Sequence, residues 1–362
     1  MSRCLIHIGM HKTGSKSIQS SLHRFADTRF IYADFDKPNH TLALHTLFTS
    51  GASPRPYLLR KRDPESAIPK FRRAMQSQLE GSIRACDGRT LIMSGEGISN
   101  KFDRDALATM RDYLRRHFDE ISIVGYVRPP AGYMTSSFQQ GVKGGRPVRF
   151  EAVYRSYQKT FGKFDEVFGR ENVRLYKFDP GDFPQRCVVR DFCSRVGIGL
   201  PVERIVRLNE SLSRQSVCLL YTYGKLGGPY GAHDLKGRER QALRKLLENL
   251  GHDRFRLSPE IVRPILMQNR ADIEWMEARL GLSLEEGLRE HQPGDILEEA
   301  DLLRPDPAVA RKIIEMLGDR APAGVAGETP EQVAQLVNAL RTQFVEHRSG
   351  KGESMQEQSD AA

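Results

Sequence analysis

The stretch Cys4–Leu22, CLIHIGMHKTGSKSIQSSL, decides the fold of this chain. Its first five residues, Cys4–Ile8, are mostly apolar and form a run short enough for a buried strand. Gly9 ends that run. The next apolar residues recur at spacings of four and three, which is one face of a helix: Ile18, Leu22 and Phe25. The stretch therefore predicts a strand, a tight loop and a helix.

The loop between this strand and this helix is rich in groups that bind anions. Lys12 and Lys16 supply full charges, and Ser15 and Ser17 supply hydroxyl donors. The first turn of a helix adds free backbone N–H groups and the positive end of a dipole. The loop therefore predicts a phosphate site; the simpler alternative is an ordinary serine cap with solvated lysines.

The loop also comes close to the Walker A pattern, Gly-x4-Gly-Lys-Ser/Thr. Gly9 and Gly14 have the required separation, but Ser15 stands between Gly14 and Lys16. The lysine arrives one residue late, which would rotate it by roughly 100° around the helix. A nucleotide kinase therefore stays open as an alternative function.

Composition sets the broad class. The chain has 362 residues, with 39% hydrophobic and 28% charged residues, which is ordinary for a globular protein. No apolar run approaches the ~20 residues that a membrane span needs, so we expect none. The net charge of +9 favours anionic partners. No basic stripe is interleaved with aromatic residues, so nucleic acid is not the expected partner.

The cysteines and the N-terminus bear on the compartment. Five scattered cysteines form no Cys-x-x-Cys pair, so we expect reduced thiols and no structural zinc. The first apolar run stops at Gly9, too early for a signal peptide. These features predict a cytoplasmic protein without structural zinc.

Strands and helices alternate through the first two thirds of the chain. Further strands are predicted at 29–33, 90–93, 121–127 and 173–176, and helices at 39–50, 65–86, 103–118, after Pro130 and at 183–196. Gly51–Pro56 is predicted to be a turn region. The alternation predicts an α/β fold with a central, mainly parallel sheet flanked by helices.

The last third changes character. It shows helical periodicity without clear strands, at 240–250, 259–280, 307–317 and 330–345, while 226–234 is predicted to be a Gly-rich loop. The predicted organisation is an α/β core over 1–207, a helical part over 208–346 on the acceptor side, and a polar, disordered tail over 347–362.

Two later segments place polar groups at strand ends. The strand at 90–93 leads into Ser94-Gly95-Glu96-Gly97, which exposes a carboxylate where parallel sheets bind ligands. The strand at 121–127 leads into Arg128-Pro129-Pro130, and Pro130 cannot continue a central strand. Arg128 and Ser136, eight residues on, could therefore face one ligand.

Together these motifs resemble the sulfotransferase family that uses 3′-phosphoadenosine 5′-phosphosulfate (PAPS). The family's loop is Lys-x-Gly-Thr-Thr or Lys-Thr-Gly-Thr-Thr after the first strand; here it reads Lys12-Thr13-Gly14-Ser15-Lys16. Its second motif is Arg-x-Pro with a Ser eight positions after the Arg, matched by Arg128, Pro130 and Ser136. The resemblance covers roughly residues 1–196, and the position of Glu96 suits the bacterial branch.

The resemblance implies a P-loop-like sulfotransferase fold and a role for each motif residue. Lys12 would stabilise the charge on the departing phosphate. The remaining loop residues would hold the 5′-phosphate: Thr13, Gly14, Ser15, Lys16 and Ser17. Arg128 and Ser136 would bind the 3′-phosphate. Asn209 and Ser211 would close over the donor.

The base that takes the proton from the acceptor is open between two residues. The family uses a Glu or a His, and this chain offers Glu96, which we prefer, and His11 beside the loop. The resemblance predicts PAPS as co-substrate, no metal, and a hydroxyl-bearing acceptor, with a carbohydrate as one candidate. A P-loop kinase and a non-catalytic nucleotide-binding protein are the alternatives. The acceptor cannot be read from the sequence.

Overall fold

The computed structural model describes residues 2–50, 64–145, 154–208, 211–235 and 237–359. The predicted turn region Gly51–Pro56, together with Asn209, lies outside the described residues. The chain divides into two compact units, each made of three segments. The first unit comprises Met1–Tyr133, Arg155–Asn209 and Asn269–Glu286; the second comprises Met134–Tyr154, Glu210–Gln268 and Gly287–Ala362.

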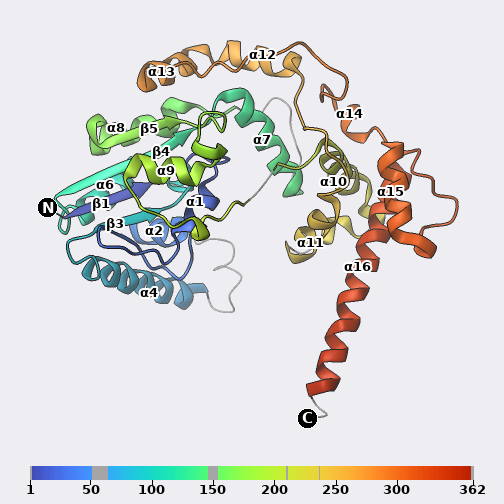
Figure 1. Cartoon of the computed structure of the whole chain (residues 1–362), viewed down its shortest axis with the longest axis horizontal. Helices are drawn as coiled ribbons and strands as arrows, with labels where there is room; N and C mark the ends of the chain where they lie inside the picture. Colours follow the sequence, from blue (N-terminus) through green and yellow to red (C-terminus); the bar gives the residue numbers. More distant parts are fainter. Residues whose placement is uncertain (1, 51–63, 146–153, 209–210, 236, 360–362) are drawn as a thin grey trace. The chain divides into compact units, whose positions relative to one another are not determined.

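The first unit is built on a five-stranded sheet in the order β2-β3-β1-β4-β5 (Figure 1). Its strands are β1 Arg3–His7, β2 Phe30–Tyr32, β3 Thr90–Ser94, β4 Glu120–Val127 and β5 Val173–Lys177. All four pairings between these strands are parallel. The predicted α/β fold with a central parallel sheet is confirmed.

The helices of the first unit follow the strands. They are α1 Ser15–Leu22, α2 Thr41–Phe48, α4 Pro64–Arg84, α5 Ile98–Lys101, α6 Arg104–Leu114, α8 Lys163–Phe168, α9 Val188–Val196 and α13 Arg270–Leu280. α7, Pro130–Lys143, begins in the first unit and continues in the second. Parallel pairing requires such crossover connections, because after each strand the chain must return to the end of the sheet where that strand began before the next strand can start.

One face of the sheet is covered by α1 and α9, which contact each other. Ile18 and Leu22 of α1 and Phe192 of α9 share a core with Leu5 and Val124 of the strands. Burying one such side chain contributes roughly 1.5–3 kcal/mol to the stability of the fold. This buried contact holds α1 against the sheet, and with it the loop that precedes α1. Successive side chains of β1 point to opposite faces of the sheet. α8 contacts β4 and β5.

The second unit is helical. Its helices beyond α7 are α10 Arg214–Leu226, α11 Gly237–Leu247, α12 Pro259–Gln268, α14 Glu299–Leu303, α15 Pro307–Leu317 and α16 Pro330–Ser359 (Figure 1). α10 contacts α11, α14 and α16, and α15 contacts α16. Among the helices of the described segments, none combines the length and apolar character that crossing a membrane would need.

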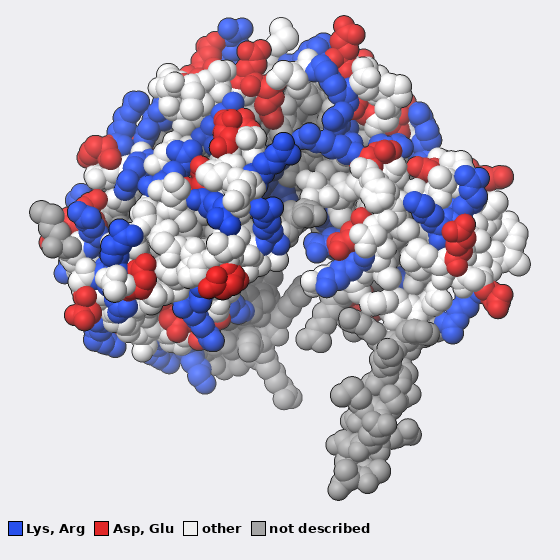
Figure 2. All heavy atoms as spheres, in the orientation of Figure 1, with Lys and Arg blue, Asp and Glu red and all other residues white. Residues whose placement is uncertain are grey.

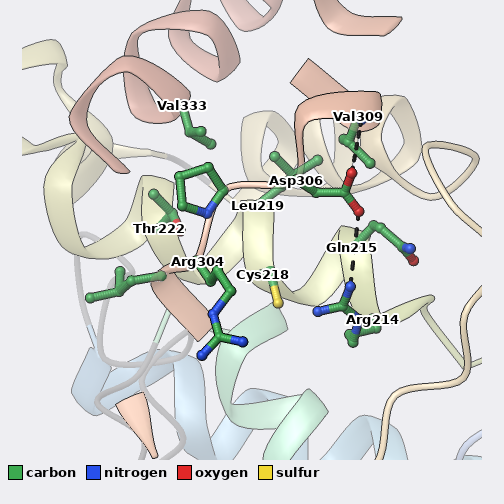
Figure 3. A pocket seen from close by; sticks show the side chains of 11 residues that line it. Arg214, Gln215, Cys218, Leu219, Thr222, Arg304, Asp306, Val309 and Val333 are labelled. Atoms are coloured by element: carbon green, nitrogen blue, oxygen red, sulfur yellow. Dashed lines mark hydrogen bonds and ion pairs between the residues drawn. The ribbon is translucent and has the colours of Figure 1, made fainter. Parts of the chain in front are cut away.

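A small pocket of the second unit lies beside α10 (Figure 3). Asp306 forms one wall, caps α15 by accepting from Ala308 N and Val309 N at 3.1 and 3.3 Å, and pairs with Arg214 Nη2 at 3.9 Å. Cys218 lines the same pocket, and burial raises the pKa of its thiol to about 11. These polar groups are engaged in holding the helices together.

Basic and acidic side chains are interspersed over the face drawn in Figure 2. All five cysteines are buried and unpaired.

Several predicted helix boundaries were wrong. The single helix predicted over 259–280 is two helices, α12 and α13, separated by Asn269, whose φ of −107° and ψ of 18° are not helical. Asn leaves helical geometry readily because its side chain competes for backbone hydrogen bonds. The helix predicted at 183–196 starts only at Val188, because Gln185 and Arg186 both have a φ of 53°.

The loop and tail of the last third also differ in detail. The predicted loop at 226–234 contains two short 3₁₀ turns, Gly228–Tyr230 and Ala232–Asp234. α16 continues to Ser359, into residues predicted to be disordered; no proline after Pro330 ends it. The first unit ends one of its segments at Asn209, and the sequence division was predicted at 207. Nothing in the sequence indicates that 134–154 belongs to the second unit and 269–286 to the first.

We predict that Arg279→Ala lowers the free energy of unfolding by about 3–5 kcal/mol. The Arg279 guanidinium donates to both Asp165 oxygens at 2.7 and 2.8 Å and to Val173 O at 2.7 Å, and both side chains are largely buried. Removing it leaves the Asp165 carboxylate unpaired. Urea unfolding measures the loss.

Arg270→Ala on the same helix is the control, because Arg270 and Glu274 form an exposed pair. It should leave stability nearly unchanged. Equal losses for the two variants would contradict the prediction.

Candidate functional site

The candidate site lies where the strands of the first unit end. Because β1, β3 and β4 are parallel neighbours, their carboxyl ends meet at one edge of the sheet. The loop before α1, the turn that holds Glu96, and Arg128 follow these three strands in turn. The fold therefore brings three of the predicted motifs to one edge.

The backbone of the first loop depends on its glycines. Gly9 and Gly14 have φ of 31° and 71°, and Lys12 has the left-handed φ of 72° without being a glycine. A Cβ on Gly9 would lie 2.3 Å from Ser15 Oγ, and one on Gly14 would lie 2.6 Å from Val188 Cγ1. Both positions thus need glycine for space as well as for conformation.

The hydroxyl groups of the loop are buried and make contacts within the protein. Thr13 Oγ1 donates to Met10 O at 2.6 Å and lies 3.4 Å from Ser15 Oγ. Ser17 Oγ accepts from Leu208 N at 3.0 Å, which ties the start of α1 to a distant segment. Their roles toward a phosphate therefore stay predictions.

The cations of the loop differ in exposure. Lys16, in the first turn of α1, is exposed, whereas Lys12 is partly buried. The positive charges of both act to lower the pKa of Glu96, against the larger effect of burial, which raises it. Lys16 is thus near the Glu96 carboxylate.

Glu96 sits in a turn that is held to the first loop. Gly95 N donates to His7 O at 2.9 Å, and Ser99 Oγ donates to Gly9 O at 2.8 Å. On the far side, Gly97 N donates to Thr41 Oγ1 at 3.0 Å. These bonds fix the carboxylate beside the loop.

The pKa of Glu96 is raised above its usual value. Burial is the largest cause, because it disfavours the charged form, and the positive charges of Lys16 and Lys12 oppose it. A carboxylate with a raised pKa accepts a proton more readily, which suits a general base.

His11 lies in a cationic setting. Arg155 Nη1 lies 3.2 Å from His11 Nδ1, and because a guanidinium can only donate, Nδ1 is the acceptor. Burial lowers the pKa of His11 to about 4, and the charges of Arg155, Lys101, Lys12 and Lys16 act in the same direction. His11 is therefore neutral near pH 7 and a weaker base than an ordinary histidine.

Arg128 reaches the first loop. Its Nη1 donates to Lys12 O at 2.5 Å, its backbone O accepts from Tyr157 Oη at 2.7 Å, and its guanidinium lies 5.5 Å from the ring centroid of Phe178. The two cationic motifs, remote in sequence, thus touch each other.

Ser136 is buried in α7, within the segment that belongs to the second unit. Its predicted pairing with Arg128 on one phosphate stays a prediction.

Sequence reasoning missed three residues at this edge: Arg155, Lys177 and Glu286. Lys177 ends β5 directly beyond the predicted strand at 173–176, so its position could have been inferred. Arg155 and Glu286 stand in segments with no periodic pattern, and nothing in the sequence marks them. In the described segments, no group of three or more His, Cys, Asp or Glu residues could hold a metal ion.

The chain was compared with protein-family models, curated proteins and solved structures. No protein-family model matches the chain. No curated protein matches it either. Among solved structures, the chain is similar to the crystal structure of a sulfotransferase from Alicyclobacillus acidocaldarius, with 16% identity and a TM-score of 0.35, over 66% of this chain and 98% of that one. The site residues themselves carry the function proposed below.

We predict that Gly14→Ala costs clearly more stability than Gly281→Ala. The two glycines have nearly the same φ, 71° and 70°, so the conformational cost of alanine, about 1–2 kcal/mol, is shared. A Cβ on Gly14 would also meet Val188 Cγ1 at 2.6 Å, whereas nothing lies within 4 Å of one on Gly281. Urea unfolding of both variants measures the loss of free energy of unfolding, and the difference between them is the cost of the clash with Val188. Equal losses would show that α9 can shift away from the added Cβ at little cost.

Proposed function

We propose that this protein is a PAPS-dependent sulfotransferase that moves a sulfuryl group to a hydroxyl acceptor. The observation that supports this best is the meeting of Arg128 with the loop at Lys12, through a 2.5 Å hydrogen bond. A donor that carries one phosphate on its 5′ carbon and one on its 3′ carbon needs two cationic groups near each other. A kinase needs only the first of them.

In this proposal each loop residue has a defined task. Gly14, Ser15 and the first amides of α1, with Thr13 and Ser17 shaping the loop, hold the 5′-phosphate. Lys12 stabilises the negative charge that grows on that phosphate as the bond from sulfur to the bridging oxygen breaks. Lys16 adds a second positive charge beside Glu96. Arg128, with Ser136, binds the 3′-phosphate.

Glu96 is the proposed base. It takes the proton from the acceptor hydroxyl as that oxygen bonds to sulfur, so the proton ends on the carboxylate and the leaving phosphate keeps its electron pair. Burial raises the pKa of Glu96 and lowers that of His11, which supports Glu96 over His11 for this role. The acceptor is a hydroxyl compound, with a carbohydrate as one candidate.

The first test compares two nucleotides. We expect adenosine 3′,5′-bisphosphate to bind at least about tenfold more tightly than ADP, with chelator present, since one charge-assisted bond contributes roughly 1.5–3 kcal/mol. Arg128→Ala should remove most of that preference and leave ADP binding nearly unchanged. Arg115→Ala, at an exposed position after α6, is the control. Calorimetric titration of the two nucleotides against the three proteins measures all six affinities.

Equal affinity for the two nucleotides, or a strict need for magnesium, would favour the kinase alternative. Preference without any turnover would favour a non-catalytic nucleotide-binding protein.

The second test concerns the base. Because Glu96 must be ionised and its pKa is raised, the acid limb of kcat/KM against pH should lie above 4.5, with activity lost as the pH falls through it. Glu96→Gln should abolish turnover while donor affinity holds. A steady-state assay of bisphosphate release with a hydroxyl acceptor measures the pH profile and the turnover, and calorimetric titration measures the donor affinity.

His11→Asn is the matched comparison and should retain most of the activity. If the limb lies near pH 4 and His11→Asn is the inactive variant, His11 is the base instead.

A further inference from the structure

The N-terminus of α7 is occupied by a carboxylate from a distant part of the first unit. Gly132 N donates to Glu286 Oε2 at 2.8 Å and lies 3.2 Å from its Oε1, and the Ala131 amide also bonds to the carboxylate. α7 is 14 residues long, so its first turn presents free amides and the positive end of a developed dipole. The fold thus forms an anion site there and fills it with Glu286.

Two cationic side chains stand around the same spot. A Cβ on Gly132 would lie 2.8 Å from Glu286 Oε1 and 3.4 Å from Arg128 Nε, so the carboxylate and the Arg128 side chain flank one glycine. Lys177 ends β5 in register with Val127, the residue before Arg128. The charges of Arg128 and Lys177 both act on Glu286. Two amides, a guanidinium and an ammonium group are the donor set that a phosphate takes.

The carboxylate is carried by a short tether. α13 ends at Leu280 and is capped by Gly281, and the chain that follows is held by Glu277, whose Oε1 accepts from Leu284 N at 2.7 Å. Leu284 is fully buried, while Glu286, two residues on, is partly exposed and lies in a segment without helix or strand. Burial raises the pKa of Glu286, although the amides and both cations oppose the rise. The carboxylate therefore lies in a partly desolvated place.

We propose that Arg128, Lys177 and the amides of Ala131 and Gly132 form the pocket of the donor's 3′-phosphate, and that Glu286 occupies this pocket until the donor displaces it. This rests on the proposed function. Lys177 becomes a binding residue, and Glu286 becomes a determinant of donor affinity. The apparent affinity is the intrinsic affinity multiplied by the fraction of molecules in which the pocket is vacant, so removal of the competing charge raises it.

The test uses the full chain and four proteins: wild type, E286Q, E285Q and K177A. Glu285 is exposed, so E285Q makes the same change of charge beside the site without touching α7. We expect E286Q to bind adenosine 3′,5′-bisphosphate about tenfold more tightly than wild type, the scale of a charge at a partly buried helix terminus. Binding of adenosine 5′-monophosphate, which lacks the 3′-phosphate, should change less than about twofold in every protein. K177A should weaken binding of the bisphosphate and leave binding of the monophosphate nearly unchanged.

The outcomes separate the two proposals. If wild type prefers the bisphosphate over ADP but E286Q binds it no more tightly, Glu286 is only a helix cap and the inference fails while the proposed function stands. If E286Q binds the bisphosphate and wild type does not, the inference is supported. If none of the four proteins binds it, both fail. Should E286Q not fold, E286D keeps the charge but shortens its reach, and unchanged bisphosphate affinity in that variant would equally overturn the inference.

Discussion

The candidate site depends on the parallel pairing of β1 with a strand on each side. Ile6 stands opposite Met93 of β3 and Ile123 of β4. The pairing with the β4 side continues past the end of β1, because Ile8 N donates to Val124 O at 2.9 Å. A loop that leaves the centre of a sheet in this way starts from a fixed point. Hydrogen bonds from Thr13 Oγ1 to Met10 O and from Ser99 Oγ to Gly9 O then hold the loop in place.

The same environment acts in opposite directions on the two candidate bases. Burial disfavours charge, so it raises the pKa of Glu96 and lowers that of His11. The surrounding cations partly reverse the effect on the carboxylate and deepen it on the imidazole. One partly buried, positively charged setting therefore shifts the pKa values of the two candidate bases in opposite directions. It also favours any ligand that brings negative charge.

The strands and the central motifs could be predicted from the sequence because their signals are local. A short apolar run ended by Gly9, and another followed by Pro130, mark β1 and β4 without knowledge of the fold. Since parallel strands end at one edge, the nearness of Glu96 and Arg128 to the first loop followed from the strand assignments. The donor roles of these residues remain predictions.

The remainder could not be predicted because it depends on contacts distant in sequence. Glu286 reaches α7 across more than one hundred and fifty positions, |i−j| being 154, and its own segment has no pattern. Ser17 looks like a phosphate ligand in the sequence, yet its hydroxyl accepts from Leu208 N. The break at Asn269 was missed because Pro264, the usual sign of a break, lies inside α12, and the helix ends four residues later, at Gln268.

The exchange of segments between the two units affects the order in which the protein can be made. The chain crosses between units after Tyr133, Tyr154, Asn209, Gln268 and Glu286. α13, which packs on β5, therefore leaves the ribosome only after most of the second unit has been synthesised. At about 5–20 residues per second, the nascent sheet waits on the order of ten seconds for that helix. During that interval the edge of β5 and the carboxylate of Asp165 are exposed on an incomplete domain, so folding of the first unit is completed late in translation and not at the end of its last strand.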